Sequence, residues 1–269
     1  MEQQKLKDAI RIISRAAKDY DDKLNGYNYI FIYKNRQNNQ IEYFESAFLP
    51  RNFQHLTGIE FIDSQGNILH NPTQFYQKCL NSTLKESDIA FKSDGTTELK
   101  LQALPLIVNF LKSSKMTAIY NSIRPKLSVD RLAGTTNFCL GFTKDKNYYV
   151  PSSCLLEDIR NLADVTFQIL AIFSKPATKN TPIYKDVRYV AKGVKLTTLS
   201  FSDELSSLIS LENYTEKRVL PKFYSDLGNT LFYETHYIYL LPFVLIIPLW
   251  NLPSPTTFCK LVSTLIIAV

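Results

Sequence analysis

The chain has 269 residues, of which 45% are hydrophobic and 21% are charged. This is enough apolar material for a packed core without disulfide bonds, and it excludes a chain that is disordered throughout, a collagen or a coiled coil. Only eight glycines are present, and GxGxxG and GxxxxGK(S/T) stretches are absent, which argues against a dinucleotide-binding or P-loop fold.

Positive charge is concentrated in the first 200 residues. Of the 31 basic and 25 acidic residues, four and six lie in 201–269, so the other 27 and 19 leave a net charge of +8 on 1–200. Such an excess favours an anionic partner such as nucleic acid. A solvated basic surface without a partner would show the same balance.

The cysteines and histidines show no metal-binding pattern. The cysteines have no CxxC spacing and no histidine close by, and the histidines are scattered along the chain. We therefore expect no metal, no cofactor, reduced thiols, and a cytoplasmic protein without a signal peptide. The residues concerned are Cys79, Cys139, Cys154 and Cys259, with His55, His70 and His236.

The first half of the chain is mainly helical in pattern. Apolar residues at spacings of three and four predict an amphipathic helix over 6–24, and two aromatic runs at 27–34 and 40–46 predict a hairpin. Three further helices are expected. The first is short, runs from Pro50 to His55 and is ended by Gly58; the others cover 72–84 and 99–111, the latter with a kink at Pro105.

From residue 115 on, the pattern changes to that of strands, expected at 115–120, 127–132, 136–142, 147–150, 166–173 and 184–191. One helix among them is predicted over 155–162, capped by Ser152 or Ser153. Helices followed by strands that pair with their neighbours predict an α+β domain over 1–200. In it, the N-terminal helices pack on a small, mainly antiparallel sheet.

Residues 201–269 differ in composition. A short acidic helix is expected at 202–211, and 25 consecutive residues between Glu234 and Lys260 carry no formal charge. A membrane span needs about 20 apolar residues, whereas prolines interrupt this run. We therefore favour a buried or irregular apolar C-terminal tail, with a membrane anchor as the alternative.

His55 is the first candidate for proton transfer. It lies in the stretch 51–58, where Phe53 and Leu56 can be buried while the imidazole faces outward. Histidine is the side chain that both donates and accepts protons near neutral pH. A surface histidine without a chemical role is the alternative.

The glycine-centred turn at 91–100 (FKSDGTTELK) is the second candidate. Two lysines flank backbone N–H groups and threonine hydroxyls there, an arrangement that can hold a phosphate. An ordinary helix N-cap completed by Glu98 would use the same residues. Further positive, aromatic and hydroxyl groups on the following strands are Lys115, Lys126, Arg131, Tyr149 and Ser153.

Five stretches, read together, resemble one family: NFQHLTGI (52–59), FKSDGTTELKLQALP (91–105), KLSVDRLAGTTNFCLGF (126–142), YYVPSSCLLEDIR (148–160) and VRYVAKG (187–193). Over residues 5–200 the chain resembles the phage-associated Barnase/EndoU/colicin/RelE-like nuclease domains of the fourth described kind. The resemblance implies a compact barnase- or RelE-like α+β domain. It also implies a metal-independent ribonuclease of toxins, phages and mobile elements. The chain departs from the family at Ser152-Ser153, where Asn-Thr is expected, and in its tail.

The resemblance also implies a site. His55 stands at the histidine of the HLTG motif, Tyr149 in the YxVP motif, and Lys92, Thr97, Glu98 and Lys100 in the K-x-DGT-x-ELK motif. In RNA the 2′-OH is itself the nucleophile, so cleavage needs proton transfer and charge stabilisation. We expect His55, Lys92 and Tyr149 to be catalytic, and Thr97, Lys100, Lys126, Arg131 and Ser153 to bind substrate.

RNA is the expected partner, and an antitoxin or immunity protein is a further one. Two other functions fit the same sequence. One is a non-catalytic RNA- or protein-binding module, for which the lysines matter and His55 does not. The other is a membrane-tethered effector that uses its tail to reach a bilayer.

Overall fold

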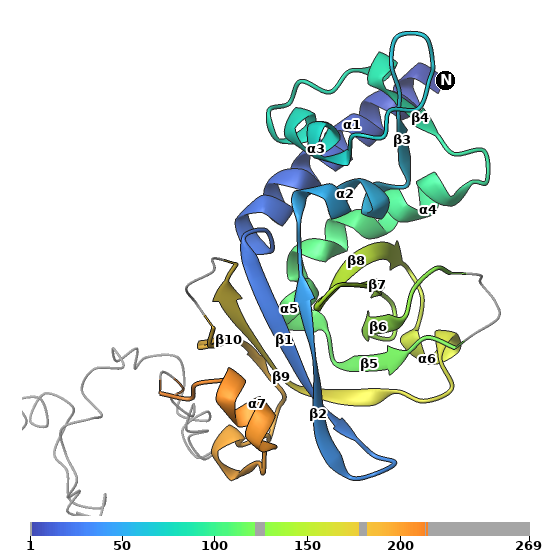
Figure 1. Ribbon diagram of the computed structural model, residues 1–269. Coiled ribbons are helices and arrows are strands. Elements are labelled where there is room, and N and C mark those ends of the chain that lie inside the picture. Colours follow the sequence, from blue (N-terminus) through green and yellow to red (C-terminus); the bar gives the residue numbers. More distant parts are fainter. Residues whose placement is uncertain (1, 122–126, 178–181, 213, 215–269) are drawn as a thin grey trace, which may run out of the picture. The chain divides into compact units, whose positions relative to one another are not determined.

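The structure, a computed structural model, describes residues 2–121, 127–177, 182–212 and 214 (Figure 1). All of them fall within one compact unit, Met1–Glu216. Among these residues no helix has the length and apolar character that a membrane crossing requires. Lys126, His236, Cys259 and most of the tail lie outside the described residues, so what the sequence predicts for them, and for the division of the chain at residue 200, stays a prediction.

Seven strands form a closed barrel (Figure 1). The strand β9 closes it, because its first residues pair with β5 while most of its length pairs with β1. An eighth strand, β10 (Asp186–Val190), pairs with the part of β9 from Ala171 to Ser174, whereas β5 pairs with Phe167 and Gln168 at the beginning of β9. In order around the barrel the seven strands are β1 (Tyr27–Asn35), β2 (Gln40–Ala47), β8 (Tyr148–Leu155), β7 (Cys139–Asp145), β6 (Arg131–Gly134), β5 (Met116–Ile119) and β9 (Phe167–Pro176).

This architecture corrects the predicted one. Neighbouring strands do pair in antiparallel fashion, but the small sheet with N-terminal helices packed on it was wrong, since the sheet closes on itself. Closure depends on pairs such as Phe31 with Ile172, which are far apart in sequence. It also depends on a parallel contact between β2 and β8 through Ser46 and Tyr149. Alternation of apolar residues specifies which face of a strand is buried, but it does not specify a distant partner strand.

The strand β1 shows why its sequence is apolar at almost every position. Tyr29, Phe31 and Tyr33 point into the main core, which includes the barrel interior. Ile30 and Ile32 point outward and are covered by a second apolar cluster that includes Leu205 and other residues after β10. A strand buried on both faces is apolar throughout instead of alternating.

Helices gather above one end of the barrel, where α1 to α4 lie together in Figure 1. A two-stranded sheet of β3 and β4 accompanies them. The helix predicted over 99–111 is divided, because the helical pattern tightens to a 3₁₀ helix at Leu104-Pro105. The elements of this layer are α1 (Glu2–Lys23), α2 (Pro50–Thr57), β3 (Ile59–Phe61), α3 (Pro72–Leu80), η1 (Glu86–Asp88), β4 (Ile89–Phe91), α4 (Thr96–Ala103), η2 (Leu104–Asn109) and α5 (Phe110–Ser113).

The helix predicted over 155–162 was wrong in its position. The strand β8 continues through both serines to Leu155, and the short helix α6 (Ile159–Leu162) is capped instead by Asp158, whose carboxylate accepts from the backbone N–H of Arg160. Ladder pairing of β8 with β7 outweighs the local capping tendency of serine. The remaining elements are η3 (Leu196–Thr198) and α7 (Asp203–Leu208).

The core joins the barrel interior to the helical layer through aromatic rings. The fully buried Phe142 of β7 has the rings of Phe31, Phe44, Phe48 and Phe110 at centroid distances of 6.0–6.3 Å. Because Phe110 comes from α5, the same cluster anchors the helices to the barrel. The position of every residue in the helical layer therefore depends on this packing.

We predict that Phe142→Ala lowers the free energy of unfolding by about 3–5 kcal/mol, because the surrounding buried rings can move only partly into the vacated volume. Denaturant unfolding of the purified chain measures this. The matched control is Leu99→Ala, which removes a 64% exposed side chain and should change stability by no more than about 0.5 kcal/mol. Equal effects of the two substitutions would contradict this account of the core.

Candidate active site

The two predicted motifs are brought together by the short sheet in the helical layer. The HLTG motif ends α2 and continues directly into β3, while the strand β4 leads into the glycine-centred turn and α4. The strands pair in antiparallel register, with Ile59 opposite Phe91. The end of the first motif therefore lies beside the beginning of the second.

Thr97 and Gly58 join the two motifs. The buried hydroxyl of Thr97 donates to the carbonyl of Gly58 at 2.7 Å and accepts from the backbone N–H of Lys92 at 3.0 Å. Gly58 has a positive φ of 68°, and a Cβ atom there would lie 2.9 Å from Cδ of Lys100 and 3.2 Å from Cα of Thr97. Glycine thus permits both the turn and the close approach. Thr97 faces the protein interior, where it positions neighbouring groups.

His55, Lys92 and Lys100 lie around this joint. The side chain of His55 is exposed on α2, and the ammonium group of Lys100 donates to the backbone carbonyl of His55 at 2.8 Å. Loss of hydration lowers the pKa of the His55 imidazole below its ordinary 6.5, and the positive charges of Lys100 and Lys92 lower it further. The pKa of Lys100 is also lowered, chiefly by burial and in part by Lys92. Three of the predicted residues therefore share one electrostatic environment.

This environment decides the protonation state of His55. With its pKa lowered below 6.5, the imidazole is mostly neutral at pH 7 and can accept a proton. The two lysines, which disfavour the imidazolium, would favour a phosphate that develops negative charge nearby. The neutral imidazole can therefore act as a general base, and the neighbouring ammonium groups favour an anionic substrate.

Tyr149 and Arg131 form a second group at the barrel. The ring of Tyr149 has the Nζ atom of Lys144 at 4.7 Å and the guanidinium carbon of Arg131 at 5.5 Å from its centroid. Arg131 is 8% exposed and also lies over the rings of Tyr33 and Phe44. Among the described residues, neither Tyr149 nor Arg131 forms a hydrogen bond, ion pair or ring contact with His55.

The helix α2 links the two groups because it lies along β8. The guanidinium of Arg51, at its beginning, forms an ion pair with Asp145 at 2.7 Å, and Asp145 stands opposite Tyr148 in the β7–β8 ladder. Near its end, the carbonyl of Leu56 accepts from the thiol of Cys154 on β8 at 3.0 Å. Residues 51 and 55 are four apart and so share a face of the helix.

Other predicted residues are placed differently. Ser153 is next to Cys154 on β8, and since adjacent strand residues point to opposite faces, its side chain is directed away from α2. His70 is exposed in the loop after β3. Lys144 and Arg51 were not among the predicted site residues, although the strand pattern of a β7–β8 hairpin places Lys144 opposite Tyr149.

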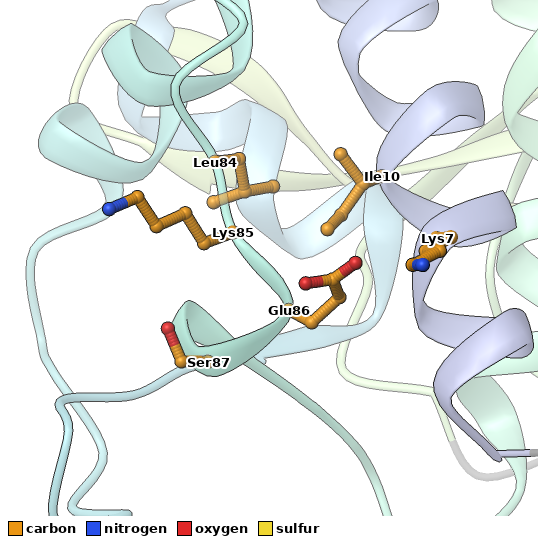
Figure 2. A pocket seen from close by; sticks show the side chains of 6 residues that line it. All are labelled: Lys7, Ile10, Leu84, Lys85, Glu86 and Ser87. Carbon is orange, nitrogen blue, oxygen red and sulfur yellow. The ribbon is translucent and has the colours of Figure 1, made fainter.

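Two further features lie outside these groups. Figure 2 shows a hollow of about 370 Å³ between α1 and the segment that leads into η1, with Ile10 and Leu84 facing each other across it. None of the predicted site residues lines it. Groups of three or more side chains able to hold a metal ion are absent from the part of the chain that the structure describes. The residues that line the hollow are Lys7, Ile10, Leu84, Lys85, Glu86 and Ser87.

Comparison with known families decides the assignment. A family model described as phage-Barnase-EndoU-ColicinE5/D-RelE like nuclease 4 matches residues 12–190. The chain belongs to this nuclease family. The resemblance seen in the sequence is thereby confirmed, and the match includes both groups described above. No curated protein and no solved structure shows significant similarity to this nuclease-family chain.

We predict that the imidazole of His55 titrates below pH 6.5 and that Lys100→Met and Lys92→Met each raise its pKa, because each removes a positive charge that disfavours imidazolium. A pH titration followed by NMR of the His55 ring measures this. Lys85→Met is the matched control, since it removes an exposed lysine at the hollow, and it should leave the titration unchanged. A His55 pKa that does not respond to either site lysine would contradict the proximity of these charges.

We also predict that Gly58→Ala destabilises the protein more than Gly26→Ala does. Both glycines have a positive φ, which costs an alanine about 1–2 kcal/mol, but a Cβ at Gly26 meets no atom within 4 Å. At Gly58 the added methyl must also displace the contact with α4, which adds about 1–3 kcal/mol. Thermal or denaturant unfolding of the two variants gives the difference, and equal losses would refute the close packing of the two motifs.

Proposed function

We propose that the protein is a metal-independent endoribonuclease that cleaves RNA by attack of a 2′-OH on the adjacent phosphorus. The 2′-oxygen forms a bond to phosphorus, the bond from phosphorus to the 5′-oxygen breaks, and the products end in a 2′,3′-cyclic phosphate and a 5′-hydroxyl. The observation that carries the proposal is the neutral, exposed imidazole of His55 held beside two lysines in a domain of a nuclease family.

In this reaction His55 is the general base. Its imidazole takes the proton from the 2′-OH, which requires the neutral form that the lowered pKa supplies. A base whose pKa lies near but below the working pH is both deprotonated and strong enough to assist. The residue that protonates the leaving 5′-oxygen is then an ammonium group or water at the same face.

Lys92 and Lys100 stabilise the charge that develops on the phosphate oxygens. An ammonium group has three N–H donors, and Lys100 uses one of them on the carbonyl of His55, which leaves others for a ligand. The lysines that lower the pKa of His55 thereby also attract the phosphate. Thr97 holds Lys92 and Gly58 in place, and we assign it a positioning role.

Arg131 and Lys126 are assigned to substrate binding, as their charge predicts. Tyr149 was predicted to be catalytic, but because its ring lies beside Arg131 we assign it to substrate binding instead. The charge of +8 on residues 1–200 attracts RNA over longer distances, so cleavage should weaken with salt. An antitoxin or immunity protein would be expected to present an acidic surface to the same basic face. Association with toxins, phages or mobile elements follows from the family and is part of the proposal.

We predict that the full chain cleaves single-stranded RNA in the presence of EDTA, with cyclic phosphate ends, and that His55→Ala lowers kcat/KM by about 10²–10⁴-fold, because it removes the proton acceptor. The rate should rise with pH through the pKa of His55 and then level off. Gel assays of RNA and of the same sequence in 2′-deoxy form measure this, and the deoxy strand should stay intact.

Lys85→Ala serves as the charge-matched control and should cleave like the unaltered chain. Full cleavage by His55→Ala would remove this residue from the mechanism. Tight RNA binding without cleavage under any condition would instead support a non-catalytic RNA-binding module.

A further inference from the structure

Arg131 carries a buried charge whose hydrogen-bonding capacity is only partly used. The residue is 8% exposed, and its Nε and Nη1 atoms have no hydrogen-bond partner in the structure. A guanidinium is always protonated, so these two nitrogen atoms carry three unused N–H donors on a full positive charge. Buried donors of this kind are rare in native proteins and indicate a missing partner.

The surrounding acidic groups do not supply that partner. Glu42 is the carboxylate whose titration Arg131 influences, but its oxygens accept from the hydroxyl of Tyr33 and from the side-chain amides of Asn35 and Asn38. Among the described residues no ion pair forms between Arg131 and a carboxylate. Apart from the hydrogen bond with the side chain of Tyr33, the positive charge faces aromatic rings, which attract cations more weakly than an anion does.

The surroundings of Arg131 select the chemistry of a ligand. The rings of Phe44, Tyr33 and Tyr149 lie 4.8, 5.3 and 5.5 Å from the guanidinium carbon. They hold the planar group in one orientation, and a guanidinium fixed in this way pairs with two oxygens of a phosphate at once. Of these three rings Tyr149 is half-buried, whereas Phe44 and Tyr33 are buried. The exposed Lys144 lies over the ring of Tyr149 and adds a second positive charge there.

We propose that Arg131, Tyr149 and Lys144 form a second phosphate-binding subsite, which holds a phosphate of the substrate strand away from the cleaved bond. The phosphate enters from the side of Tyr149. The side chain of Lys144 is exposed there, so it can swing away from the Tyr149 ring and contact the phosphate. That the phosphate belongs to a nucleic acid rests on the proposed function. The subsite itself rests on the unpaired donors of Arg131.

The two groups are connected through α2 and the end of β7. The face of α2 that carries His55 also carries Arg51, which is bound to Asp145, and Asp145 follows Lys144 in the chain. A strand that runs from His55 along α2 toward the beginning of that helix comes to Asp145 at the end of β7. Lys144 and Tyr149, the next pair of the β7–β8 ladder, are directed to the opposite face, so the strand reaches them by passing around this end of the hairpin. Contacts at both ends would fix which phosphate of the strand lies beside His55.

Binding to the full chain can be measured without cleavage by using a short single-stranded 2′-deoxy oligonucleotide, which lacks the nucleophile. We expect Arg131→Met to weaken binding about tenfold or more and to lower the slope of log K against log salt by about 0.7, as for the loss of one phosphate contact. Lys18→Met, which removes an exposed lysine of α1, is the matched control and should change neither value. Unchanged affinity and slope in Arg131→Met would overturn the proposal.

Thermal unfolding separates a binding role from a structural one. Replacing an unpaired buried charge by an apolar side chain of similar length should leave the melting temperature unchanged or raise it. A purely structural clamp would instead give a lower melting temperature with intact oligonucleotide binding, and this result would overturn the proposal.

NMR of the unaltered chain provides a measurement that does not depend on the folding of a variant. The Nε–H signal of Arg131, identified by its absence in Arg131→Lys, should shift on addition of the oligonucleotide and, at higher concentration, of inorganic phosphate. A signal that responds to inorganic phosphate alone, or to neither, would overturn the placement of the strand. Failure of the unaltered chain to cleave RNA would count against the proposed function and leave this binding result standing.

Discussion

The pairing of β1 with β9 is the contact on which the rest of the structure depends. It joins strands from opposite ends of the described chain, and with the short contact of β9 and β5 it turns a series of hairpins into a closed barrel. Closure creates an interior that aromatic side chains fill from all sides, and it removes the free edges that an open sheet would expose. The ring of Phe110 enters this interior from α5, so the helices are fixed to the barrel by the same packing.

The candidate active site is built on the edge of this framework. The strands β3 and β4 lie side by side, and the hydroxyl of Thr97 then ties the end of α2 to the beginning of α4. Each of these contacts is local. Together they place the imidazole of His55 close enough to the ammonium groups of Lys92 and Lys100 for these charges to lower its pKa. Because like charges repel, such an arrangement is stabilised only by the surrounding fold, and an anionic ligand would relieve the repulsion.

The two groups of site residues use positive charge in different ways. At His55 an exposed lysine, Lys92, and a partly buried one, Lys100, change the protonation state of a neighbour, which suits a chemical role. At Arg131 the charge is enclosed by rings and keeps unused donors, which is a binding role. The strand β8 connects them, since Cys154 contacts the end of α2 while Tyr149 contacts Arg131. This division is the basis of the proposal that one group reacts with the substrate while the other holds it.

The sequence by itself determined the local elements and the residues with chemical potential. Periodicity predicted α1, the β1–β2 hairpin and most later strands, because these depend on which side of a segment is apolar. Motif resemblance pointed to the nuclease family and to His55, Lys92 and Lys100. Only the tertiary structure decided that the sheet closes, that β8 replaces a predicted helix start at Ser152, and that Arg131 is buried beside Tyr33 and Phe44. The physical reason is that strand pairing and charge burial depend on partners distant in the chain, whose identity no local pattern of residues contains.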